Sequence, residues 1–132
     1  MKLRKPIVTV IISLAALFIA GKVLPLAIEA SYPRMRASTA AFDVESVEDG
    51  VYEGKAFLLP VSVRVRASVS GGRVTSVDIL KHFNGQGKPA EAIVTRVIEA
   101  QSLGVDTVSG ATHSSLTILK AIQNAFEKGG IR

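Results

Sequence analysis

The residues best suited to chemistry gather in one ten-residue stretch, which reads Asp106-Thr107-Val108-Ser109-Gly110-Ala111-Thr112-His113-Ser114-Ser115. It combines four hydroxyls within seven residues, a single acid and two small residues, Gly110 and Ala111, over which a bulky ligand can approach the backbone. If a helix begins here, its first N–H groups lack intrahelical partners and carry the positive end of the helix dipole. The stretch is therefore suited to holding an anion, with phosphate as the usual guest.

The same composition also suits a plain helix N-cap. Serine and threonine are common at N-cap positions, where their hydroxyls accept a backbone N–H and need no ligand. Four hydroxyls exceed what capping requires, but a helix start tolerates them. From the residues alone, a ligand site and a simple cap are both open.

Other kinds of site have little support. The sequence has no cysteine, which excludes disulfides, thiolate metal sites and a cysteine nucleophile. His82 and His113 lie thirty residues apart without a paired acid, a weak basis for a metal site. No set of nucleophile, base and orienting group is visible, so we expect no catalytic residues of a hydrolase. Arg64 and Arg66, on the polar face of a predicted strand, are interpreted as a solvated face.

The pattern around this stretch predicts an α+β domain, an antiparallel strand meander followed by two helices. Alternation of apolar and polar residues over 61–70 is typical of a half-buried strand, and Gly71-Gly72 then suits a tight hairpin turn. Residues 82–89 and 103–110 have loop composition. The predicted elements are strands over 51–57, 61–70 and 73–81, a helix over 90–101, and a helix that begins between Thr112 and Ser115 and ends near 128–130.

The N-terminal region predicts one transmembrane helix. Ile7 to Ile28 spans 22 residues with one charge, Lys22, which can snorkel toward the headgroups. Basic residues before this run place the N-terminus in the cytoplasm and the domain on the extracytoplasmic side, as a single-pass protein of the cell membrane. The alternative is a cleaved signal peptide, and an uncleaved anchor is favoured. The expected organisation is an anchor or signal segment at 1–30, a linker at 31–48 and a domain at 49–128.

The positive charge does not indicate nucleic-acid binding. The formal net charge is +5, but residues 1–30 hold four basic side chains against one acidic one. Residues 31–132 hold twelve basic and ten acidic side chains, with no basic patch interleaved with aromatic residues. The excess charge therefore belongs mainly to the membrane-targeting region.

At Asp106, Ser109, Gly110, Ala111 and Thr112, the sequence resembles the attachment signature of the FMN-binding domain family. That signature is an Asp, two variable residues and then Ser/Thr-Gly-Ala-Thr. The family includes the flavin-carrying peripheral subunits of Rnf complexes and of the sodium-pumping NADH:quinone reductase. The resemblance continues over about Asp49 to Phe126, in the stretches Asp49-Gly50-Val51-Tyr52-Glu53-Gly54, Gly72-Arg73-Val74-Thr75-Ser76-Val77 and Glu99-Ala100-Gln101-Ser102.

The resemblance implies covalent flavinylation. In such domains a flavin transferase of the ApbE type cleaves FAD and joins FMN to the signature threonine, here Thr112, by a phosphodiester. Asp106 would serve recognition by the transferase or hold the loop. The segment at His82 would lie beside the flavin, although His82-Phe83-Asn84-Gly85-Gln86-Gly87 departs from the family's usual Thr-Pro-Gly-type turn. The cofactor-binding residues expected are Thr112, Ser109, Gly110, Ala111, Asp106, Ser115, His82 and Gly85.

Three functions follow as hypotheses. The first is a membrane-anchored electron-transfer flavoprotein domain that carries FMN on Thr112 and exchanges electrons with membrane or extracytoplasmic redox partners, as a carrier or complex subunit rather than a complete enzyme. The second is a domain that binds FMN or another phosphate ligand reversibly, as a sensor without a redox role. The third is an anchored interaction module that keeps the fold without a cofactor.

Overall fold

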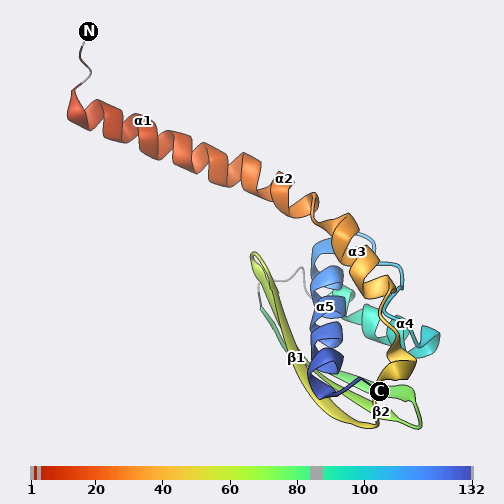
Figure 1. Ribbon diagram of the computed structural model, residues 1–132. Helices are drawn as coiled ribbons and strands as arrows, with labels where there is room; N and C mark the ends of the chain where they lie inside the picture. The colour runs from red at the N-terminus through yellow and green to blue at the C-terminus, as the bar shows by residue number, and fades with distance from the viewer. Residues whose placement is uncertain (1, 3, 84–87, 132) are drawn as a thin grey trace. The chain divides into compact units, whose positions relative to one another are not determined.

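The computed structural model describes residues 2, 4–83 and 88–131, and the chain divides into two compact units, Met1–Tyr32 and Pro33–Arg132 (Figure 1). The N-terminal unit is helical throughout, with α1 over Lys5–Phe18, a π-helical turn over Ile19–Val23 and α2 over Leu24–Glu29. Pro25 stands in the first turn of α2 and has no N–H to donate to the preceding turn, which accounts for the local change of helical pitch.

Most apolar side chains of α1 and α2 are exposed. None of the residues of α1 or α2 is buried. By length and composition, the helical run that begins at Lys5 is a candidate membrane span, a property that N-terminal signal sequences share. The predicted N-terminal transmembrane helix is therefore present as a helix of the required kind.

The second unit is built on a three-stranded antiparallel sheet in the order β1-β2-β3. The strands are β1 over Gly50–Leu58, β2 over Val61–Ser70 and β3 over Arg73–Phe83. The predicted alternation holds in β2, whose valines and Ala67 are buried on one face. Gly71 and Gly72 both have positive φ, as the predicted two-residue turn requires. The meander predicted from the sequence is confirmed.

Helices follow the sheet, as predicted. A 3₁₀ turn over Lys88–Ala92 leads into α4 over Ile93–Ala100, so the α-helix begins three residues later than the pattern indicated. Pro89 lies in that 3₁₀ turn, which Ala90 anchors in the core. The long helix α5 runs over Thr112–Gly129.

Helix α5 packs across one face of the sheet and forms the centre of the core (Figure 1). A Cβ atom at Gly54 of β1 would lie 2.2 Å from the carbonyl oxygen of Ala121 and 2.3 Å from the nitrogen of Ala125, so only glycine permits this approach. The apolar stripe of α5 is buried, and it consists of Ile118, Leu119, Ile122, Ala125 and Phe126. Polar residues beside it such as Thr117 and Gln123 are buried too, because other elements cover the remaining sides of the helix.

The segment interpreted as a linker, 31–48, is partly helical and packs against the domain. It contains α3 over Tyr32–Ala40 and a 3₁₀ turn over Val44–Ser46. Phe42 stacks on Phe126 with ring centroids 6.1 Å apart, and Val47 pairs with Ile131 in an isolated bridge. The buried residues of this segment are Thr39, Val44 and Val47. Its residues from Pro33 onward thus belong to the second compact unit.

Candidate functional site

The chemistry-bearing stretch forms a tight turn and the start of α5. The N–H of Ala111 donates to the carbonyl of Val108 at 2.9 Å, which closes a turn whose third residue, Gly110, has φ +77°. This conformation favours glycine, and open space surrounds the position that a Cβ would take. The N–H of Ser115 then donates to the carbonyl of Ala111 at 2.9 Å, the first hydrogen bond of α5.

The four hydroxyls between Ser109 and Ser115 divide into two pairs. Ser114 and Ser115 are fully buried, whereas Ser109 is exposed and Thr112 is partly exposed. The Oγ of Ser115 accepts the N–H of Val108 at 3.1 Å, so this hydroxyl holds the turn against the first turn of the helix. The structure therefore gives Ser115 an internal partner and leaves the hydroxyls of Ser109 and Thr112 on the accessible side.

The start of α5 differs from a simple side-chain N-cap. The residue at the N-cap position is Ala111, which has no side-chain acceptor, and among the described residues no side chain caps the helix. The side chain of Thr112 makes no hydrogen bond with any residue that the structure describes. The hydroxyls are thus not used as a cap, and a helix start without a side-chain cap fits an anionic ligand.

Two arginines hold the loop that leads into the turn. Nη1 of Arg96 donates to the carbonyl of Asp106 at 2.8 Å and to that of Thr107 at 3.1 Å. Nη2 of Arg36 donates to Oγ1 of Thr107 at 3.2 Å. The side chain of Asp106 is exposed beside an open hollow of about 600 Å³, which is lined by Arg96, Glu99, Ala100, Gly104, Val105 and Asp106. Neither arginine could be identified from the sequence, since their contacts depend on tertiary structure and have no local signal.

His113 connects the start of α5 to the end of the β1–β2 hairpin. Its Nε2 lies 2.7 Å from the carbonyl oxygen of Leu58, the last residue of β1. The carbonyl can only accept, so Nε2 carries the proton and donates. This imidazole is therefore engaged in positioning Thr112 relative to the sheet.

His82 lies near the same end of the sheet, on β3 opposite Val63. Its side chain is 6% exposed, and Nδ1 lies 3.5 Å from Oε1 of Glu91. Its Nε2 is buried and has no hydrogen-bond partner among the residues that the structure describes. A buried polar atom without a partner is costly, so this nitrogen fits a polar group of a ligand. The predicted contact Gly85 lies outside the described residues, and so do Asn84 and Gly87.

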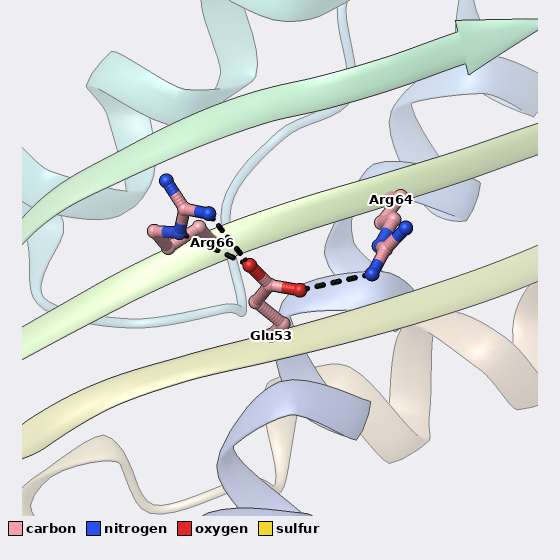
Figure 2. Close-up of polar contacts among 3 residues, drawn as sticks. All are labelled: Glu53, Arg64 and Arg66. Atoms are coloured by element: carbon pink, nitrogen blue, oxygen red, sulfur yellow. Dashed lines mark hydrogen bonds and ion pairs between the residues drawn. The ribbon is translucent and has the colours of Figure 1, made fainter.

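The polar outer face of the sheet is a separate feature. Figure 2 shows Glu53 of β1 between Arg64 and Arg66 of β2, with Oε2 of Glu53 3.1 Å from Nη2 of Arg64 and Oε1 2.7 Å from Nη2 of Arg66. These hydrogen bonds, led by that of Arg66, hold the pKa of Glu53 below its ordinary value. All three side chains are well exposed, which agrees with a solvated face.

Comparison with known proteins points to one kind of domain. A family described as an FMN-binding domain matches residues 60–127, slightly more than half of the chain. A 96-residue segment, 70% of this chain, is 28% identical to an uncharacterized protein of Treponema pallidum (strain Nichols). A 55-residue segment, 41% of this chain, is 38% identical to the NADH:acrylate oxidoreductase of Vibrio harveyi. The match covers 27% of the first relative and 6% of the second.

Proposed function

The chain belongs to the FMN-binding domain family, and we propose that it is a membrane-anchored electron carrier with FMN joined covalently to the Thr112 hydroxyl. One observation carries the proposal: Thr112 opens a helix that has no side-chain cap among the described residues, in a sequence that matches the family's attachment signature. The hydroxyl has no competing hydrogen bond in the described part of the chain, and Thr112 as a residue is partly exposed, which suits the formation of an ester.

The surrounding residues fit a phosphodiester at this position. The α5 N-terminus favours the remaining negative charge of the phosphate. The open space around Gly110 and the small side chain of Ala111 admit a bulky group close to the backbone. The Thr112 oxygen would form a bond to the FMN phosphorus of FAD as the bond to the adenylate breaks, so that AMP and the hydroxyl proton leave. A flavin transferase of the ApbE type would direct this exchange, with the exposed Asp106 available for recognition.

His82 would complete the site. Its buried Nε2 lacks a partner among the described residues. Because Glu91 would accept the proton on Nδ1, Nε2 of the neutral imidazole is an acceptor, and a flavin offers a ring N–H and ribityl hydroxyls that can donate to it. When bound, FMN supplies the redox chemistry, while the protein supplies attachment, orientation and electrostatics. Glu91 beside Nδ1 would fix the orientation and tautomer of the imidazole.

The relatives support the role of an electron carrier, and the N-terminal helix supports its location at a membrane. The name of the Vibrio harveyi relative describes an oxidoreductase, and this chain matches 6% of it, which favours an electron-carrying unit over a complete enzyme. The helix that begins at Lys5 would anchor the chain. Lys2, Arg4 and Lys5 precede the apolar run, so the domain would lie on the extracytoplasmic side.

Intact mass spectrometry tests the proposal. The full chain is coexpressed with a flavin transferase of the ApbE type, and wild type should gain the mass of FMN less one water. Thr112→Val, which keeps the shape of the side chain, should gain nothing. Thr112→Ser keeps the hydroxyl and should retain the modification. An unmodified wild type with an active transferase, or a modified Thr112→Val, contradicts the attachment.

Acid precipitation separates covalent from reversible binding. Yellow colour that stays with the denatured pellet supports the phosphodiester. Colour released into the supernatant supports the alternative of a reversible FMN-binding module. A chain without flavin absorption in either fraction supports the third hypothesis, an interaction module without a cofactor.

A further inference from the structure

Large apolar side chains are exposed at the end of the sheet where the β1–β2 turn lies and β3 ends. This region, which holds Phe57, Leu59 and Phe83, is called the hairpin end below. Phe57 is 67% exposed, Leu59 is 43% exposed and Phe83 is 57% exposed. Phe57 pairs with Ser62 of β2, and Ser62 pairs with Phe83 of β3, so the two aromatic side chains share the outer face of the sheet. Clustered apolar groups of this size on the surface of a domain indicate an interaction site.

A basic row lies directly beside these side chains. Lys55, Arg64 and Lys81 pair across the three strands, one register step from Phe57 and Phe83. Nζ of Lys81 lies 5.8 Å from the centroid of the Phe83 ring. The acids of this face, Glu53 and Asp78, stand with Arg66 in the next row, further from the hairpin end, and Glu53 forms ion pairs with Arg64 and Arg66. The hairpin end is therefore apolar at its tip and positively charged behind it.

The chain enters the domain at this same end. Helix α3 and the segment after it run parallel to α5, because Ser38 contacts Gln123, Phe42 stacks on Phe126, and the N–H of Glu48 donates to the carbonyl of Gly130. Arg36, near the start of the second unit at Pro33, consequently lies toward the first residues of α5, and its side chain contacts Thr107 of the loop before α5. The contact of His113 with Leu58 places the hairpin end there too.

We propose that the hairpin end is a membrane-docking surface, in which Phe57, Leu59 and Phe83 enter the bilayer interface and the basic row contacts anionic lipid headgroups. Aromatic and aliphatic side chains backed by lysine and arginine form the combination that binds such an interface. The candidate membrane span begins at Lys5, and its apolar run over residues 7–28 lies a few residues before Pro33, where the second unit begins. A bilayer that holds this run is therefore the surface kept within reach of the domain. An acidic protein surface could also pair with the basic row, but no feature of the fold would bring such a surface to the hairpin end.

Lipid quenching in proteoliposomes tests this docking. The sequence has no cysteine, so single-cysteine variants of the full chain can carry one fluorophore each. Leu59→Cys labels the hairpin tip, and Val51→Cys is the matched control, an apolar residue 64% exposed on the outer face at the opposite end of β1. In phosphatidylcholine–phosphatidylglycerol vesicles that contain doxyl-labelled lipid, quenching at position 59 should exceed that at position 51 several-fold.

Charge reversal provides the second arm of the experiment. Lys55→Glu and Lys81→Glu should each shift the docked-to-undocked ratio by about fivefold or more, because a basic side chain near an anionic membrane contributes on the order of that factor. Vesicles of phosphatidylcholine alone should reduce the quenching at position 59 in the same way.

Equal quenching at positions 59 and 51 overturns the proposal. The proposal is also overturned if doxyl-labelled lipid does not quench the probe at position 59 while native membranes shield the same probe from a water-soluble quencher. That result would identify a protein partner. Flotation of the same vesicles reports the anchor, and intact mass reports the flavin. A failure of docking is thereby distinguishable from a failure of anchoring or of flavinylation.

Discussion

The imidazole Nε2 of His113 lies 2.7 Å from the carbonyl oxygen of Leu58 and joins the first turn of α5 to the last residue of β1. The histidine directly follows Thr112 in the sequence, so the residue beside the proposed ester fixes the helix start to the sheet. The attachment point of a flavin on Thr112 would therefore have a fixed position relative to the β1–β2 hairpin.

Replacement of His113 by Ala should lower the stability of the domain. Loss of the donor leaves the part-buried Leu58 carbonyl without this partner, at a cost of about 1 kcal/mol. Thermal unfolding of the full chain in detergent, followed by circular dichroism, measures the change. His113→Gln offers an amide donor and should recover part of the loss. Equal unfolding temperatures for wild type and His113→Ala would show that the contact contributes nothing.

Ser115 and Ser109 should differ sharply when each is replaced by Ala. The Oγ of Ser115 accepts the N–H of Val108 inside the core, whereas Ser109 is exposed and its side chain has no hydrogen bond among the described residues. Ser115→Ala should therefore destabilise the domain by about 1–2 kcal/mol, and Ser109→Ala should stay within about 0.5 kcal/mol of wild type. The same unfolding measurement decides between them, and comparable losses in both variants would refute the assignment of Ser115 as the internal anchor of the turn.

The fold could be predicted from the sequence wherever one face of an element is buried and the other is solvated. Strand β2 is the clearest case, because its inward residues alternate with polar ones for ten positions, and Gly71-Gly72 marks the turn that follows. The segment 31–48 shows the limit. Thr39, Val44 and Val47 are buried at irregular spacing, so neither the helical nor the strand period identifies them as core.

The candidate site could be predicted from the sequence only in part. The turn with Gly110 and the start of α5 at Thr112 follow from local residue types. The division of the hydroxyls into buried and accessible pairs does not, because it depends on what covers each side of α5. The same holds for Arg36, which reaches Thr107 from 71 positions away, and for the burial of His82 beside Glu91.

His82→Leu should leave the stability of the flavin-free protein intact but change the properties of the flavin in the loaded protein. Without flavin, the substitution removes a buried nitrogen that has no partner among the described residues, and with it the long 3.5 Å contact of Nδ1 with the part-exposed Glu91. Stability should therefore be unchanged or higher by about 1 kcal/mol. With flavin on Thr112, loss of the imidazole should shift the flavin absorption maximum and midpoint potential if Nε2 contacts the ring. Redox titration and unfolding of both forms measure the two effects. A stability loss without flavin, together with an unchanged potential, would assign His82 a structural role instead.

Glu53 should give the domain a stability that depends on pH. Hydrogen bonds from Arg66 and Arg64 lower the pKa of its carboxyl in the folded state below the value in the unfolded chain. The folded protein then binds fewer protons, so the stabilisation is fully present above the unfolded pKa and is lost as the pH falls through the folded pKa.

The difference in stability between wild type and Glu53→Gln should accordingly be largest near neutral pH and disappear in acid. High salt should reduce it as well, because all three side chains are exposed to solvent. Glu99→Gln is the matched control, since Glu99 is an exposed carboxylate that forms no ion pair within the part of the chain that the structure describes. Unfolding temperatures of the three proteins across the acidic range test the relation, and a difference that persists unchanged below the ordinary range of glutamate would contradict the ion pairs as its source.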